Sequence, residues 1–372
     1  MNIVVAPDSF KGSLTSIKAS EIMKKAITII DKDCRVSLKP MADGGEGTLE
    51  SMLASTKGQR ISITCTGPLG EKADTSYAIV DSHTAIIECA SIAGLVQVPE
   101  DERNPDLTTT LGIGEAMMDA LDKGCTSFVL GLGGSATNDG GLGMLMALGM
   151  KAWDQKGSEV GPYGKDVQQV SRVSFKDIDE RLAETDIKVA SDVDNPLCGE
   201  RGATHVYGPQ KGLRKEDLER YDSALDRYGD AVESVLEKHY RNIPGAGAAG
   251  GLGFALLAIG GSLVSGAKLL ADAMNTEEAI QNADLVLTGE GQSDEQTLYG
   301  KAPGYIASLA QKYHVPAVLI SGSLDGNLDV LGEKFSGCFS IVNKPLSLKE
   351  CMENADQLLY EQTKQVIRLS RI

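Results

Sequence analysis

The sequence predicts an α/β fold: a doubly wound parallel-sheet domain built from both chain ends, with a second α/β domain containing a mixed sheet inserted between. Three observations support this prediction. Short apolar, β-rich runs alternate with helical patterns at both ends of the chain. One region of the middle instead has strand-like runs in direct succession. The 372 residues are also too many for a single hydrophobic core.

The N-terminal part begins the alternation. Residues 3–6 form an apolar run typical of a buried strand, and apolar side chains recur through residues 15–30 at the spacing of an amphipathic helix. Residues 35–39 are predicted to form the next strand and residues 48–55 the next helix. Such a succession predicts parallel strands joined by right-handed crossover connections.

The middle of the chain is organised differently. Three strand-like runs follow one another without a long helix between them, which predicts an antiparallel or mixed section: 61–66, 75–80 and 84–90. A helical pattern then covers residues 111–124, and a charged helix is predicted over residues 215–238.

The strand-then-helix alternation returns near the C-terminus, in the segments 285–288, 302–313, 317–321 and 339–342. The sequence therefore predicts a discontinuous, doubly wound α/β domain of residues 1–75 plus 265–372. Residues 76–264 are predicted to form the inserted domain, with the active site in the cleft between the two.

Charge and composition restrict the class of function. The formal net charge is −16, which argues against nucleic acid or an anionic membrane as a partner. No apolar run reaches the length of a membrane-spanning helix, and the first residues, MNIVVAPDSFKG, lack the features of a signal peptide. Seven cysteines without a C-x-x-C pair indicate reduced thiols, so a cytoplasmic protein is expected. The four histidines share no metal-ligand spacing, and no zinc site is predicted.

Acidic residues follow several predicted strands, where the ligands of open α/β sheets bind. The pattern occurs in four segments, with Asp8, Asp43 and Glu46, Asp192 and Asp194, and Glu290 and Asp294. Carboxylates that share a cleft need a compensating charge. Oxygen ligands without a histidine or cysteine partner suit Mg²⁺, so the sequence predicts magnesium rather than zinc.

Two glycine-rich stretches, GLGGSATNDGGLG at 131–143 and PGAGAAGGLG at 244–253, formally match a dinucleotide-binding fingerprint. The second does not follow a predicted strand, and the glycines of the first continue where a Rossmann helix should already be running. Neither Gly-Lys pair belongs to a Walker A motif. The stretches therefore predict a non-Walker phosphate cradle, with dinucleotide binding and close packing of glycines as the alternatives.

Lysines are interleaved with these acidic and glycine-rich segments, namely Lys11, Lys211 and Lys301. Carboxylates for a metal, lysines for anionic oxygens and glycine loops for phosphates together indicate phosphoryl transfer. A covalent route is not indicated, because Ser135 lies outside a G-x-S-x-G elbow and no histidine is placed by the sequence to activate it.

Seven motifs together resemble the bacterial glycerate kinase family: APDSFKGSLTS (6–16), ADGGEGT (42–48), GLGGSATNDGG (131–141), SDVDNPLCG (191–199), GPQKG (208–212), PGAGAAGGLG (244–253) and TGEGQSDEQTLYGKAP (288–303). The resemblance implies that the doubly wound domain is flavodoxin- or Rossmann-like and carries an inserted α/β domain. It also implies an ATP- and Mg²⁺-dependent kinase that phosphorylates the 2-hydroxyl of D-glycerate to give 2-phospho-D-glycerate and ADP. Unrelated glycerate kinases use the 3-hydroxyl, so the choice of hydroxyl depends on family membership alone.

Within this reading, Asp192 or Asp194 is expected to accept or orient the hydroxyl proton, with Asn195 assisting. Lys11 is the candidate anchor for a phosphate oxygen or for the glycerate carboxylate. The candidate Mg²⁺ ligands are Asp43, Glu290 and Asp294. The remaining candidates for substrate and phosphate binding are Asp8, Ser9, Ser13, Gly133, Gly134, Ser135, Asn138, Lys211, Gly245, Gly247 and Gly250.

Two other classes of function remain open at this stage. A nicotinamide-dependent hydroxyacid oxidoreductase would use the same glycine loops, and a noncatalytic sensor of small acids would use them as an anion clamp. The expected partners are small molecules only, D-glycerate and ATP, in a protein that acts as a monomer or a homodimer.

Overall fold

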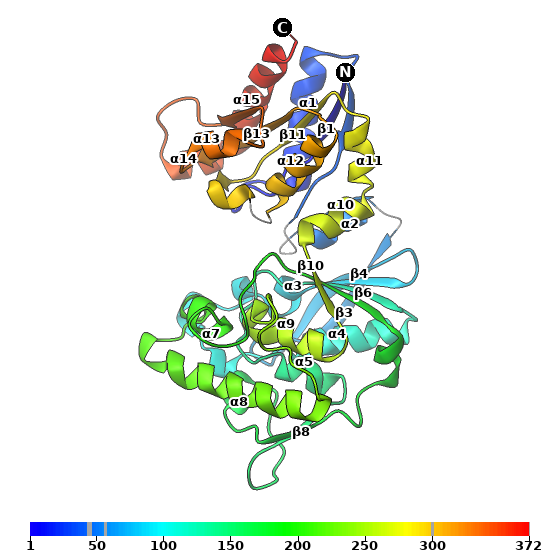
Figure 1. The fold of residues 1–372 in the computed structure, drawn as a ribbon, viewed down its shortest axis with the longest axis vertical. Helices are drawn as coiled ribbons and strands as arrows, with labels where there is room; N and C mark the ends of the chain where they lie inside the picture. Colours follow the sequence, from blue (N-terminus) through cyan, green and yellow to red (C-terminus); the bar gives the residue numbers. More distant parts are fainter. Residues whose placement is uncertain (43–46, 56–57, 299–300, 372) are drawn as a thin grey trace. The chain divides into compact units, whose positions relative to one another are not determined.

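The computed structural model describes residues 1–42, 47–55, 58–298 and 301–371. The chain divides into two compact units (Figure 1). Unit 1 comprises Met1–Asp43, Glu50–Thr56 and Ser265–Ile372, and unit 2 comprises Gly44–Leu49 and Lys57–Val264. Unit 1 is thus assembled from both ends of the chain.

Unit 1 contains a five-stranded parallel sheet in the order β15-β13-β11-β1-β2. Its strands are β1 (Asn2–Val5), β2 (Arg35–Leu38), β11 (Leu285–Thr288), β13 (Ala317–Ser321) and β15 (Gly337–Ser340). In chain order this is the 2-1-3-4-5 order of a flavodoxin-like sheet, and the direction of winding reverses between β1 and β11. The predicted fold class is confirmed for this unit.

Helices cover both faces of this sheet. Ile3 and Val5 of β1 join a core with Met23 of α1 (Ser16–Ile30) and Leu359 of α15 (Ala355–Leu369), and these two helices pack together. Val4 points to the opposite face and is buried, because strand side chains alternate in direction. The unit also contains α10 (Gly266–Ala273), α11 (Thr276–Gln281), α12 (Ala302–Lys312), α13 (Leu328–Gly332), α14 (Leu348–Glu353) and a short parallel pair, β12 (Gln292–Ser293) with β14 (Ser323–Leu324). Helix α2 (Thr48–Ser55) is divided between the two units at Leu49.

Unit 2 contains a six-stranded sheet in the order β10-β9-β6-β5-β4-β3. The strands are β3 (Gly58–Thr66), β4 (Lys72–Val80), β5 (Thr84–Glu88), β6 (Ser127–Gly131), β9 (Asp186–Ala190) and β10 (Ser262–Val264). The first three pair antiparallel and the remaining pairs are parallel, so the predicted mixed sheet is confirmed.

The helices of unit 2 are α3 (Cys89–Ala93), α4 (Leu111–Asp122), α5 (Leu142–Ala147), α6 (Gly164–Val167), α7 (Ala203–Tyr207), α8 (Leu218–Leu236) and α9 (Ala248–Ala258). A second, two-stranded sheet pairs β7 (Lys151–Trp153) with β8 (Arg172–Ser174). Unit 2 also contains short 3₁₀ turns, at Leu95–Gln97, Glu100–Glu102, Pro105–Leu107, Glu180–Glu184, Pro209–Lys211 and Lys215–Asp217. A further 3₁₀ turn, Glu295–Leu298, lies in unit 1.

Individual boundaries follow local chemistry. Helix α1 begins at Ser16 because the Thr15 hydroxyl accepts the Lys18 amide at 3.2 Å as an N-cap. The strand predicted over 84–90 ends at Glu88, since α3 begins at Cys89. The charged helix predicted over 215–238 starts as a 3₁₀ turn and continues as α8. In the described part of the chain, no helix has both the length and the apolar character needed to cross a membrane.

Candidate functional site

The loop after β1 carries the first group of predicted site residues. It is joined to the loop after β11 by the Asp8 amide, which donates to the Gly289 carbonyl at 2.8 Å. The side chain of Asp8 is buried and accepts the Ser9 amide at 2.6 Å, while Lys11 is exposed. The Ser13 hydroxyl donates to the Phe10 carbonyl at 2.9 Å. The structure therefore brings Asp8, Ser9, Lys11 and Ser13 together at the carboxyl end of β1.

Glu290 lies at the centre of a buried hydroxyl cluster at the end of β11. Its Oε1 accepts hydrogen bonds from the Ser293 hydroxyl at 3.0 Å and from the Thr297 hydroxyl at 2.7 Å. Ser293 also bonds Ser321, the last residue of β13, at 2.7 Å. The loop after β11 thus fixes one oxygen of Glu290 and is itself tied to the end of β13, at the edge where open α/β sheets bind ligands.

The other oxygen of Glu290 faces a lysine. Lys301 Nζ lies 3.7 Å from Glu290 Oε2 and 3.9 Å from Asp294 Oδ1. The third predicted metal ligand, Asp43, lies outside the described residues, as does Glu46. Within the described ranges, no group of three His, Cys, Asp or Glu side chains could enclose a metal ion. Mg²⁺ commonly takes one or two protein carboxylates and completes its shell with phosphate oxygens and water, so Glu290 and Asp294 fit an ion carried by a nucleotide.

In unit 2, the first glycine loop leaves β6 and ends at the start of α5, and it is built around Asp139. This residue is fully buried and accepts the amide and hydroxyl of Thr110, at 2.9 and 2.7 Å, and the Gly141 amide at 3.0 Å. Burial raises the pKa of Asp139, and the hydrogen bonds from Thr110 and the loop amides oppose that effect. Gly140 and Gly141 have φ of 63° and 72°, a conformation that favours glycine.

Lys211 also holds the first glycine loop in place. Its side chain is buried, and Nζ donates to the Ser135 hydroxyl at 2.8 Å and to the Thr137 carbonyl at 2.6 Å. Burial lowers the pKa of Lys211 to about 8. The ammonium group thus places a positive charge within hydrogen-bonding distance of Ser135 and Thr137, in the loop where the sequence predicts phosphate binding.

The remaining predicted residues of this loop differ in exposure. Gly133 is half-buried and Gly134 is exposed, with φ of 74° at Gly134. Asn138 is buried, and its side-chain amide donates to the Thr204 hydroxyl of α7 at 3.0 Å. Gly133 and Gly134 are therefore the more accessible part of the loop, whereas Asn138 anchors it to α7.

The second glycine loop packs between the first loop and the acidic loop, defined here as residues 191–199. The amides of Gly245 and Gly247 both donate to the Asn195 carbonyl, at 3.1 and 2.9 Å. Gly250 has φ of 69°, and a Cβ there would collide with the Thr137 carbonyl. The Gly250 carbonyl also accepts the Gly140 amide at 2.9 Å. Close packing thus accounts for these glycines, and their role in phosphate binding stays a prediction.

The acidic loop follows β9 and presents its two aspartates differently. Asp194 is exposed and pairs with Arg201, with 2.8 Å between Oδ2 and Nη2. Asp192 is half-buried, and its Oδ2 is out of contact with solvent. The side chain of Asn195 bonds the Arg201 carbonyl at 2.7 Å and accepts the Tyr207 hydroxyl at 2.5 Å. Asp192 is thus the more shielded acid.

Several residues that shape these loops were not found by sequence reasoning: Asp139, Thr110, Thr204, Tyr207 and Arg201. Asp139 lies inside a predicted motif, but an aspartate among glycines is typical of an ordinary turn. Its partner Thr110 is 29 residues away in the sequence. The tertiary partners of Asn138 and Asn195 on α7 are likewise set by the fold, and no local pattern marks them.

The geometry does not favour the dinucleotide alternative. In a Rossmann unit the glycine turn leads directly into a helix. Here α5 begins only at Leu142, beyond the whole of the first glycine stretch. The second stretch does not follow a strand, and positive φ at Ala249, Gly250 and Gly251 interrupts the start of α9.

Comparisons with known proteins agree with the motifs. The model of the glycerate kinase family matches residues 3–371. A glycerate kinase of Halalkalibacterium halodurans is 40% identical, covering 99% of this chain and 98% of that protein, and the glycerate 2-kinase of Escherichia coli is 41% identical, covering 95% and 94%. A crystal structure from Salmonella typhimurium LT2, provisionally named glycerate kinase 2, superposes with a TM-score of 0.88 at 38% identity over 100% of this chain and 98% of that one. This chain belongs to the glycerate kinase family.

Proposed function

We propose that this protein is an ATP-dependent kinase that phosphorylates the 2-hydroxyl of D-glycerate, giving 2-phospho-D-glycerate and ADP. The family match and the 41% identity to a glycerate 2-kinase support the substrate and the hydroxyl. The observation that carries the proposal is the construction of unit 2. There, the acidic loop accepts hydrogen bonds from the second glycine loop, the second glycine loop bonds the first, and a buried lysine holds the first in place.

Asp192 is assigned as the group that accepts or orients the hydroxyl proton of glycerate. A general base must be held in a fixed position beside the reacting hydroxyl. Asp194 is exposed, whereas Asp192 is half-buried in the same loop, with its Oδ2 out of contact with solvent. Asn195 fixes the loop through its bonds to Arg201 and Tyr207, which makes it a support for Asp192.

The glycine loop of residues 131–143 is assigned to the phosphates of ATP. Backbone amides of a glycine-rich turn bind anions, and a nearby positive charge strengthens that binding. Gly133 and Gly134 are the accessible part of the loop, and Lys211 fixes the following residues through Ser135 and Thr137. Lys211 therefore acts here chiefly as the support and charge of the loop.

In unit 1, Lys11 is assigned to an anionic oxygen of a substrate, either the glycerate carboxylate or a phosphate. It is exposed, and it lies in a loop whose shape is set by the Asp8 bond to Ser9 and the Ser13 bond to Phe10. A single lysine charge in such a loop can bind either anion.

Mg²⁺ is included in the proposal as the ion that accompanies ATP. Glu290 and Asp294 are the described residues that would hold it, with Asp43 as a further candidate. When bound, Mg²⁺ would neutralise negative charge on the transferred phosphoryl group. Lys301, beside both carboxylates, would hold them in place before the nucleotide arrives. The proposed partners are small molecules only, in a cytoplasmic monomer or homodimer.

The test is a coupled assay that follows ADP release with purified protein, ATP, Mg²⁺ and D-glycerate, with L-glycerate as the matched control. The proposal expects turnover that requires ATP and favours the D-enantiomer. ADP release that is unaffected by omitting glycerate would overturn it. Reduction of NAD by glycerate at 340 nm, without any ATP turnover, would instead support the oxidoreductase alternative.

A further inference from the structure

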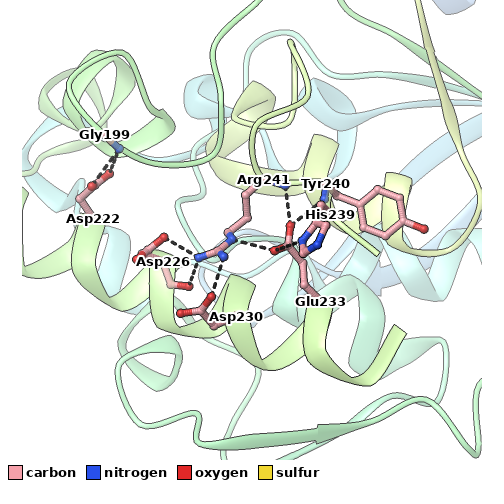
Figure 2. Close-up of polar contacts among 8 residues, drawn as sticks. All are labelled: Gly199, Asp222, Asp226, Asp230, Glu233, His239, Tyr240 and Arg241. Atoms are coloured by element: carbon pink, nitrogen blue, oxygen red, sulfur yellow. Dashed lines mark hydrogen bonds and ion pairs between the residues drawn. The ribbon is translucent and has the colours of Figure 1, made fainter. Parts of the chain in front are cut away.

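The acidic loop is anchored to helix α8. None of the residues assigned to the proposed reaction belongs to this helix. The first anchor is Asp222 of α8, which is 9% exposed. Both of its carboxylate oxygens accept the Gly199 amide, at 3.1 and 2.9 Å (Figure 2). Burial raises the pKa of Asp222, and the hydrogen bond from Gly199 opposes that effect. A buried carboxylate is thus placed at the end of the acidic loop.

The second anchor is Arg241, whose guanidinium group binds three carboxylates of α8. Figure 2 shows these ion pairs: Nη1 to Asp226 at 2.7 Å, Nη2 to Asp230 at 2.5 Å and Nε to Glu233 at 3.0 Å. Glu233 also accepts the backbone amide of Arg241 at 2.8 Å. Charge-assisted bonds in several directions fix both the side chain and the backbone of Arg241.

A glycine allows Arg241 to lie directly against the helix. A Cβ at Gly229 would collide with Arg241 Cδ and would come within 3.2 Å of Leu197 Cδ2. In this position the Arg241 carbonyl accepts the Leu197 amide at 2.9 Å. The acidic loop is therefore held at two points, Leu197 and Gly199, from one helix and the arginine fixed on it.

These anchors are connected to both glycine loops by consecutive hydrogen bonds. Asn195, two residues before Leu197, accepts the amides of Gly245 and Gly247 through its carbonyl. The second glycine loop then accepts the Gly140 amide of the first through the Gly250 carbonyl. A shift of the acidic loop would therefore be transmitted through the second glycine loop to the first, which is assigned to ATP.

We propose that Asp222 and Arg241 are positioning residues for the kinase reaction: they act through the acidic loop and hold Asp192 and Asn195 where the reaction needs them. The inference rests on the proposed function of that loop. A displacement of about 1 Å at a reacting group can cost about 100-fold in rate, although the residue that causes it touches no substrate.

The kinetic test uses Asp222→Leu and Arg241→Met, with Asp222→Asn as the conservative variant that keeps an acceptor oxygen for Gly199. We expect kcat to fall about 10- to 100-fold in the first two variants, with KM for D-glycerate and for ATP within about threefold of wild type. Asp222→Asn should retain kcat within about threefold. If Asp222 and Arg241 only stabilised the fold, kcat would not fall at nearly unchanged KM, and Asp222→Asn would not selectively retain kcat.

Arg181→Met is the matched control, since Arg181 also binds two carboxylates in unit 2, Asp122 at 3.0 Å and Asp179 at 2.7 Å. It should leave kcat unchanged. Gly229→Ala is the milder second variant if Asp222→Leu or Arg241→Met does not fold, because it displaces Arg241 and keeps every charge. Wild-type kcat in folded Gly229→Ala and Arg241→Met would overturn the inference.

Amide hydrogen exchange tests the anchoring without any activity. Peptides that cover residues 191–199 and 244–251 should exchange faster in Asp222→Leu and Arg241→Met, and at the wild-type rate in Arg181→Met. Unchanged exchange in the first two variants would overturn the inference. A wild-type protein without glycerate kinase activity would overturn the proposed function instead, so the two failures are distinguishable.

Discussion

Replacing Lys211 by methionine should make the stability of unit 2 respond differently to pH. The Lys211 ammonium is buried and donates to the Ser135 hydroxyl and the Thr137 carbonyl. Burial lowers its pKa from 10.5 to about 8 in the folded protein. Between these two values the unfolded chain keeps the proton and the folded chain releases it. Wild-type stability therefore gains from Lys211 as the pH rises from about 8 towards 10.5.

The magnitude follows from the two pKa values. At pH 7 lysine is protonated in both states, and the linkage contribution is close to zero. At pH 9.5 the difference in protonation adds about 2 kcal/mol to the free energy of unfolding of the wild type. Methionine cannot titrate, so Lys211→Met lacks this gain. The free energy of unfolding of the wild type minus that of the variant, called the stability gap here, should therefore rise by about 2 kcal/mol between pH 7 and pH 9.5.

The measurement is urea unfolding of both proteins at the two pH values. The single tryptophan, Trp153, lies in unit 2, so its fluorescence reports that unit. Comparing the gap at two pH values cancels the titration of all groups that the proteins share. Lys188→Met, at an exposed position on β9, is the control and should give a constant gap. If the stability gap for Lys211→Met is the same at both pH values, the ammonium group of Lys211 is not buried in the folded protein.

Three further predictions concern the assigned site. Asp192→Asn should lower kcat at least about 100-fold, and Asp194→Asn should remain within about threefold of wild type, as steady-state kinetics would show; wild-type kcat in Asp192→Asn would contradict the base assignment. Glu290→Gln should raise the Mg²⁺ concentration needed for half-maximal activity about tenfold, and an unchanged Mg²⁺ titration would count against a ligand role. Lys11→Ala should weaken binding of one substrate about tenfold or more in calorimetric titrations with each substrate alone, and unchanged affinity for both, with unchanged turnover, would make Lys11 a surface cation.

The fold could be predicted from the sequence because its signals are local. A short apolar run marks a buried strand such as residues 285–288, and apolar residues at helical spacing mark an amphipathic helix such as α1. Few orders of the parallel strands are then possible, because crossover connections between them are right-handed. The position of the acidic residues after β1, β9 and β11 could be predicted for the same reason, because their place after a strand is visible in the sequence.

The contacts of individual loop residues could be predicted less well, because they depend on partners far away in the chain. No local pattern indicates that the Lys211 ammonium group bonds Ser135 and Thr137, more than 70 residues earlier. Nor does one indicate that the amides of Gly245 and Gly247 bond the Asn195 carbonyl. The roles of these residues in ligand binding stay predictions. Only the folded structure shows which donors are already used.

The proposed reaction is the transfer of the γ-phosphoryl group of ATP to the 2-hydroxyl of D-glycerate. Phosphorus NMR of the products of wild-type protein, ATP, Mg²⁺ and D-glycerate tests it most directly, because the phosphorus couples to one proton in the 2-phosphate and to two in the 3-phosphate. We predict a doublet from 2-phosphoglycerate that appears together with ADP and is absent without the protein. A triplet from 3-phosphoglycerate, or ADP without any phosphoglycerate, would rule out phosphorylation of the 2-hydroxyl.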